Sequence, residues 1–225
     1  MTTTFTSKLA APARKVSAGL LLGAALAATV VAHAGAAHAT PAAGSPDLRI
    51  SAAVFGDPSA AAPFWRYQTD SDCGEMSVAD VVGQITGQEP SERDVTAVAE
   101  KTPSTVHSGM MWHSGAYTSN GDLRTLLSTY GIDSEDGSRS FEDLEQALGN
   151  GQKVIVGLND NIVWNTSGDR KSENHFVVVT GIDLESGKVH LNDSGIASGK
   201  DEQVSVADFK KSWATSHDFA VITAK

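Results

Sequence analysis

The chain is poor in cysteine, because Cys73 is the only one among its 225 residues. A single cysteine excludes an intrachain disulfide. The segment that precedes it reads as an export signal, and an unpaired thiol in an exported protein indicates either an intermolecular bond or a reactive group. This scarcity makes Cys73 the first candidate for chemistry.

Positive charge is also scarce, with 17 lysines and arginines against 27 aspartates and glutamates and a formal charge of −10. A strongly acidic chain lacks the basic surface that nucleic acids and anionic membranes require. The phosphate-binding and dinucleotide-binding glycine motifs are missing, and His107 and His113 match no zinc spacing. We therefore expect no nucleic-acid partner and no metal or organic cofactor.

Acidic residues are absent before Asp47, and the first 39 residues have the order of a secretion signal. A basic start is followed by a charge-free apolar run over 16–32, and 37–39 reads Ala-His-Ala, a cleavage site. An uncleaved anchor is the alternative, but a spanning helix needs roughly 20 apolar residues. We expect cleavage after Ala39, a secreted or extracytoplasmic protein without stable membrane insertion, and a formal charge of −13 once three cations are lost.

Residues 40–63 are rich in alanine, proline, glycine and serine, and predict a flexible leader, in which 48–55 could add an edge strand. The folded domain is expected over 64–225. Its first half has helical periodicity and capping signals, and its second half has short apolar strands. The expected helices start near 73, 91, 120 and 141, with a late one over 206–214; the expected strands are 154–158, 175–180, 189–192 and 219–222. Helices followed by strands predict an α+β fold with two lobes.

Cys73 lies where a polar loop gives way to an apolar helical pattern at Val78, Val81, Val82 and Ile85. A thiol at a helix start meets unpaired N–H groups and the positive end of the helix dipole, which favour the nucleophilic thiolate. The alternative is a small buried apolar side chain, which describes most free cysteines.

His175 is the candidate general base, because it opens a buried strand and so lies at its rim. If 175–180 and 189–192 form a hairpin centred on Leu184, His175 lies opposite Asp193, close enough for the carboxylate to orient the imidazole. A tighter turn at 185–187 is the rival, and it would separate the pair by about four residues unless a bulge restored it. A core histidine and a turn-forming aspartate remain the plain alternatives.

Gln68 is the candidate oxyanion donor, because its amide lies five residues before Cys73 and could act beside the Cys73 backbone N–H. The alternative is a surface glutamine. Trp112 and Trp164 fall in the two long loops, 102–118 and 159–174, which could form the walls of a cleft.

Together, Gln68, the run 72–74 with Ser77, the run 174–181 and the pair 192–193 resemble papain-like cysteine peptidases, and most closely the bacteriocin-processing (double-glycine leader) peptidase group. The sequence departs from this group at Ser194, where proline is common, and in a Gln–Cys gap shorter by one residue. The resemblance implies a helical lobe carrying the cysteine helix, packed on an antiparallel-sheet lobe. It also implies a nucleophile at Cys73, a base at His175, an orienting carboxylate at Asp193 and an oxyanion donor at Gln68.

The sequence thus favours an exported cysteine peptidase that acts on a peptide or protein through a covalent acyl-enzyme. A cell-wall amidase or endopeptidase, or an acyl transferase, would use the same residues. A non-catalytic binding module on the same fold, with an incidental thiol, is the alternative of a different class.

Overall fold

The computed structural model describes residues 54–225, so the expected signal peptide and most of the expected leader lie outside the described residues. The last part of that leader is folded. Residues 54–63 form strand β1 (Val54–Gly56), helix α1 (Pro58–Ala61) and part of a 3₁₀ turn (Ala62–Phe64). The domain therefore starts before the predicted boundary at Phe64, because β1 pairs with a central strand.

The elements follow the expected order, helices first and strands second. The helices are α2 (Cys73–Thr86), α3 (Glu92–Ala99), α4 (Asn120–Thr129), α5 (Phe141–Gly149), α6 (Asp160–Val163) and α7 (Val206–Trp213), with a 3₁₀ turn at Ala214–Ser216. The further strands are β2 (Ser134–Ser138), β3 (Val154–Leu158), β4 (His175–Asp183), β5 (Lys188–Asn192), β6 (Glu202–Ser205) and β7 (Phe219–Thr223). Within 54–225, no helix has both the length and the apolar character to cross a membrane.

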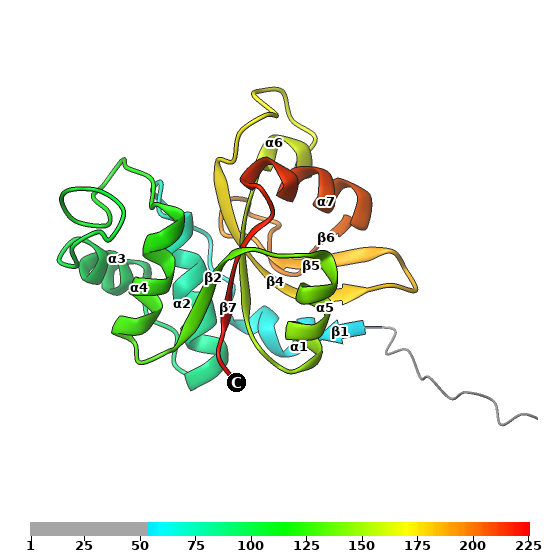
Figure 1. Cartoon of the computed structure of the whole chain (residues 1–225), viewed down its shortest axis with the longest axis horizontal. Helices are drawn as coiled ribbons and strands as arrows, with labels where there is room; N and C mark the ends of the chain where they lie inside the picture. Colours follow the sequence, from blue (N-terminus) through cyan, green and yellow to red (C-terminus); the bar gives the residue numbers. More distant parts are fainter. Residues whose placement is uncertain (1–53) are drawn as a thin grey trace, which may run out of the picture. The chain divides into compact units, whose positions relative to one another are not determined.

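The strands form one antiparallel sheet in the order β2-β7-β3-β4-β5-β6, with β1 beside β4. Helices cover both faces, as Figure 1 shows: α2, α3 and α4 lie on one side, and α5 and α7 on the other. Successive side chains of a strand point to opposite faces, so Phe176 and Val178 enter the core under α2, while Val177 and Val179 enter the core under α7. Burial on both faces explains the unbroken apolar runs of β3 and β4. The predicted α+β fold, with a helical lobe on an antiparallel-sheet lobe, is confirmed.

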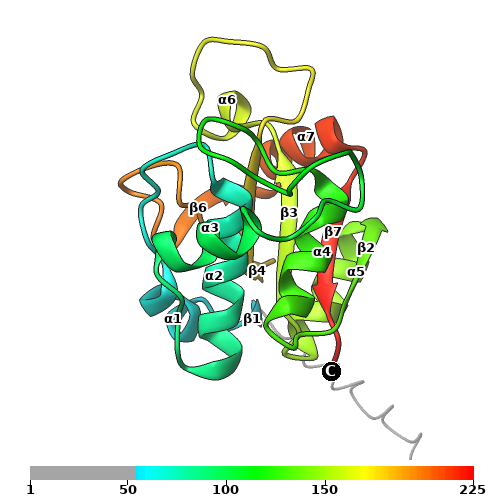
Figure 2. The same cartoon turned by 90° about the vertical axis from the view of Figure 1, so that its left-hand side faces the viewer.

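Glycine and capping residues in the sequence predicted several helix ends correctly. Gly87, with φ of +74°, terminates α2 in the left-handed conformation that glycine adopts without strain. The side chain of Ser91 caps α3, and Ser140 and Asp143 form the expected capping box at the start of α5. Figure 2 looks onto the face formed by α2, α3 and α4.

Two strands had no apolar signal in the sequence. β2 reads Ser-Glu-Asp-Gly-Ser and β6 reads Glu-Gln-Val-Ser, and they form the two ends of the sheet order. Edge strands commonly carry polar and charged residues, which discourage pairing with other chains. A search for apolar strands therefore passes over them.

The β4–β5 hairpin does not have the predicted register. Asp183 pairs with Lys188 around a turn at 184–187, and the register shifts between Val179 and Gly181, where Thr180 forms a bulge. Neither the register centred on Leu184 nor the tighter rival matches, because the four-residue turn already pairs Asp183 with Lys188, and the bulge then shifts the pairing by one residue. Continued past Asn192, the observed register would place Asp193 beside Val177 rather than opposite His175.

Candidate active site

Cys73 is the first residue of α2 and is 5 % exposed. The preceding Asp72 leaves helical geometry and accepts the first helix bond from Met76 N through its carbonyl oxygen. This geometry places the thiol in the first turn, as the apolar periodicity predicted. The first turn of α2 is the part of a helix where backbone N–H groups stabilise negative charge.

Cys73 and His175 share one cavity of about 340 Å³. His175 comes from the start of β4, and its imidazole is near enough to the Cys73 sulfur for the sulfur to raise the pKa of His175. The two long loops contribute walls, as expected. The other lining residues are Tyr117, Thr118, Asn120, Glu173, Asn174 and Phe176.

On its other side the imidazole meets a carboxylate. His175 Nε2 lies 2.7 Å from Asp193 Oδ1, and both residues are buried. Gly195 N donates to the same oxygen over 2.7 Å, and Trp164 Nε1 donates to Oδ2 over 3.1 Å. Three donors fix the Asp193 carboxylate, so the imidazole has a defined orientation.

The electrostatics of this pair follow from its contacts. Burial opposes the charged imidazole, but the Asp193 carboxylate and then the Cys73 sulfur outweigh it and raise the pKa of His175 well above its usual value. Burial likewise opposes the Asp193 carboxylate, but His175 and the other donors hold its pKa below the usual value. The arrangement stabilises a protonated imidazole beside an ionised carboxylate.

The indole ring of Trp164 packs against the imidazole ring of His175. The two ring centroids are 5.4 Å apart with the planes tilted by 58°. A side chain at Gly195 would bring Cβ to 2.8 Å from His175 Cε1 and 3.0 Å from Trp164 Cη2, so only glycine fits there without a shift. No sequence pattern predicts these two roles, although Trp164 belongs to a loop that was expected to border a cleft. Trp112, in contrast, is a buried core residue whose indole donates to the Ser71 carbonyl.

Gln68 is bonded to Ser194, the residue that follows Asp193, but it is not among the residues that line the cavity. Its backbone N–H donates to the Ser194 carbonyl, and its Oε1 accepts from the Ser194 hydroxyl over 2.7 Å. Its Nε2 donates to the Asp70 carbonyl over 2.8 Å. One amide hydrogen remains after these bonds, so an oxyanion role for Gln68 stays a prediction.

Buried carboxyl groups surround the start of α2. Burial raises the pKa of Glu75 to about 7, although Thr118 donates a hydrogen bond to it. Burial, and then the neighbouring Glu92, raises the pKa of Asp72 to about 7. Neither oxygen of Asp72 has a hydrogen-bond donor among the described residues. The carboxyl groups of Asp72 and Glu75, near the start of the helix that carries Cys73, therefore change their protonation state near neutral pH.

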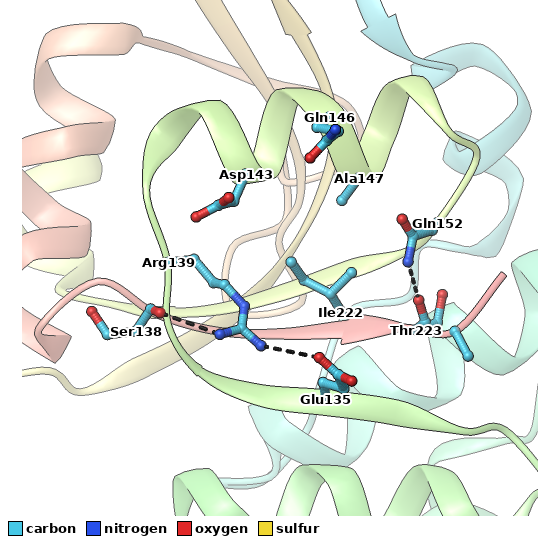
Figure 3. Close-up of a pocket in the computed structure, with 10 residues that line it drawn as sticks. Glu135, Ser138, Arg139, Asp143, Gln146, Ala147, Gln152, Ile222 and Thr223 are labelled. Carbon is cyan, nitrogen blue, oxygen red and sulfur yellow. Dashed lines mark hydrogen bonds and ion pairs between the residues drawn. The ribbon is translucent and has the colours of Figure 1, made fainter.

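A second cavity, of about 440 Å³, lies between α5 and the strands β2 and β7 (Figure 3). Arg139 enters it and is already engaged, since one guanidinium nitrogen donates to the Ser138 carbonyl and another pairs with Glu135 at 3.7 Å. Its lining includes neither cysteine nor histidine. The cavity beside Cys73 is therefore the better candidate for covalent chemistry.

The chain is similar to known proteins in sequence and in fold. Residues 60–221 match the model of the Peptidase_C39 like family. Uncharacterized proteins of Mycobacterium tuberculosis and Mycobacterium bovis are each 44 % identical over 205 residues, covering 80 % of this chain and 88 % of theirs. A crystal structure of a Bacillus anthracis protein, named as a C39-like peptidase, superposes with a TM-score of 0.58 at 20 % identity, covering 76 % of this chain and 98 % of that one. At that identity the superposition supports the fold alone.

Proposed function

Because the chain belongs to the Peptidase_C39 like family, we propose that it is an exported cysteine peptidase that hydrolyses peptide bonds with Cys73, His175 and Asp193. The observation that carries the proposal is the position of the imidazole, which contacts the Asp193 carboxylate and lines one cavity together with Cys73. Since Nε2 is bonded to Asp193, Nδ1 is the ring nitrogen left for the thiol proton.

The reaction follows from these positions. His175 takes the thiol proton, and the thiolate attacks the carbonyl carbon of the scissile peptide bond. The protonated imidazole, stabilised by Asp193, then gives its proton to the leaving amine as the C–N bond breaks. Water, deprotonated by His175, cleaves the resulting thioester and releases the acid and the free thiol.

The tetrahedral intermediates carry a negative oxygen that needs donors. The Cys73 backbone N–H, free in the first turn of α2, is one such donor. The remaining Nε2 hydrogen of Gln68 is the second, with the amide held by Ser194 and Asp70. No step requires a metal or organic cofactor.

Export rests on the sequence of residues 1–39, with a charge-free run and an Ala-His-Ala cleavage site. An exported peptidase acts on peptides or proteins outside the cytoplasm. Mass spectrometry of the secreted protein from a bacterial host checks this step: a mature N-terminus at Thr40 supports it, and a cell-retained chain with an intact N-terminus contradicts it.

The activity is tested with iodoacetamide on the chain from Thr40 onward, across pH 4 to 10. Fast alkylation of Cys73 near pH 6 that is lost in His175→Ala supports a thiolate held by the imidazole. Alkylation that follows the titration of an ordinary thiol would support the non-catalytic module. Release of peptides from unfolded casein, compared with release from peptidoglycan fragments and abolished by Cys73→Ala, then separates a peptidase from a cell-wall amidase.

A further inference from the structure

Glu202 is the first residue of the edge strand β6, and it lies behind the proposed catalytic pair. It pairs with Leu191 on β5, and directly paired residues point to the same face of a sheet. Asp193 follows Leu191 by two residues and so belongs to that face too. Glu202 and Asp193 are thus diagonal neighbours on one face, near enough for the Asp193 charge to raise the pKa of Glu202.

The two carboxyl groups differ in what else they meet. Asp193 is fully buried and accepts hydrogen bonds from His175, Gly195 and Trp164. No side-chain or backbone donor of the described residues reaches Glu202 Oε2, which is closed off from solvent. The Asp193 charge and the burial of Oε2 both oppose a second negative charge, so one of the two carboxyl groups holds a proton. The donors around Asp193 favour its ionised form, which leaves the proton on Glu202.

We propose that Glu202 is a positioning residue, which donates a hydrogen bond from its protonated carboxyl group to Asp193 and so holds that carboxylate against His175. The inference rests on the proposed function, since it concerns the group that orients the base. It extends the unit from Cys73, His175 and Asp193 to a fourth side chain, which touches no substrate and acts through Asp193.

The surroundings of Glu202 make this contact dependent on pH. Burial, and then the Asp193 charge, raises the pKa of Glu202 to about 7, while His175 acts in the opposite direction. The other charged groups nearby are engaged elsewhere: Asp201 pairs with His190, Lys200 lies over the Trp65 ring, and Asp208 caps α7 through Ser205. Above about pH 7, loss of the Glu202 proton replaces the hydrogen bond by repulsion between two carboxylates, which pushes Asp193 away from His175.

Three variants separate the proton on Glu202 from simple packing. Glu202→Gln keeps a donor that cannot ionise, and Glu202→Met keeps the length without a donor. Glu185→Gln, in the exposed turn of the β4–β5 hairpin, is the matched control. Infrared spectra at pH 6 report the carbonyl stretch of protonated carboxyl groups, and iodoacetamide alkylation of Cys73 across pH reports the state of the His175–Cys73 pair.

We expect the infrared difference spectrum between wild type and Glu202→Gln at pH 6 to contain the band of a protonated carboxyl group. This band should disappear as the pH rises past about 7. Glu202→Met should slow alkylation at pH 6 by roughly tenfold, the cost of a buried acceptor that loses its donor. Glu202→Gln should restore the rate and keep it above pH 7, where the rate in wild type falls.

Absence of that band, or identical pH profiles for wild type and Glu202→Gln, would overturn the role of Glu202. A band that is present while wild-type Cys73 alkylates like an ordinary thiol would overturn the proposed peptidase function instead, and leave the shared proton in place. The two failures are therefore distinguishable.

Discussion

His175 Nε2 lies 2.7 Å from Asp193 Oδ1, although the two residues are not opposite each other in the β4–β5 ladder. The contact is made after β5 ends, where Asp193 N donates to the Gly199 carbonyl and the Asp193 carbonyl accepts from Trp65 Nε1. The position of the Asp193 carboxylate thus depends on the loop that follows β5 as much as on the strand itself.

Asp193→Asn should leave the fold intact and lower kcat/KM by about a hundredfold or more, because the amide keeps the shape but not the charge that holds the imidazolium. The pKa of His175 should fall, since the Asp193 charge raises it. NMR titration of the His175 ring and hydrolysis of casein measure both effects. Asp201→Asn is the matched control, because Asp201 makes a 2.7 Å contact with His190, which does not line the cavity. Equal loss in both variants would contradict a specific role for Asp193.

Gln68→Ala separates the oxyanion step from thiolate formation. Removing an oxyanion donor costs roughly a hundredfold to a thousandfold in kcat. Alkylation by iodoacetamide passes through no oxyanion, so its rate at Cys73 should change little. An unchanged kcat would show that the Gln68 amide, bonded to Ser194 and Asp70, serves only to hold the loop.

Gly195→Ala should impair activity more than stability. The added Cβ would lie 2.8 Å from His175 Cε1, so the imidazole or the Trp164 ring must move. We expect slower alkylation of Cys73 with a small change in melting temperature. Gly121→Ala is the control, since its Cβ would meet only Val106, an exposed side chain. Unaltered alkylation in Gly195→Ala would mean that the site tolerates a shifted imidazole.

Glu75 should make the domain more stable in mild acid than at neutral pH. Its pKa is raised by burial from 4.5 to about 7, so the folded state keeps a proton that the unfolded state releases. The free energy of unfolding therefore falls as pH rises from 4.5 to about 7, by about 1 to 3 kcal/mol. Glu75→Gln should reduce this slope by that amount in urea titrations at pH 5 and 8, and the slope that remains comes from other buried carboxyl groups, Asp72 and Glu202 among them. The exposed Glu142→Gln should leave the slope unchanged, and an undiminished slope in Glu75→Gln would contradict the role of Glu75.

Features that depend on neighbouring residues in the sequence were predicted correctly. The start of α2 at Cys73, the caps at Ser91 and Ser140, and the buried strands β3 and β4 follow from periodicity and side-chain capping. The hairpin register was wrong, because the turn at 184–187 is one of several that the sequence of this loop allows and the bulge at Thr180 has no signal in an apolar run. The expected closeness of His175 and Asp193 was nevertheless right, because a diagonal pair with a loop behind it reaches as far as an opposed pair.

The roles of the residues around Asp193 could not be predicted from the sequence, for a different reason. Trp164 and Gly195 belong to loops, where neither spacing nor periodicity fixes a direction. Glu202 lies on a polar edge strand that has no apolar pattern. Each of the three acquires its role only where the loop after β5 meets His175, Trp164 or the edge strand β6 in space.

Strand β1 joins β4 over Gly181–Asp183, beyond the stretch that pairs with β3. Gly56 packs so closely there that a Cβ would lie inside the contact distance of the Thr180 carbonyl oxygen. A recombinant form trimmed to begin at Phe64 would therefore remove one of the two strands that pair with the far end of β4, the strand whose first residue is His175. A recombinant form that keeps the complete sheet has to begin upstream of Val54.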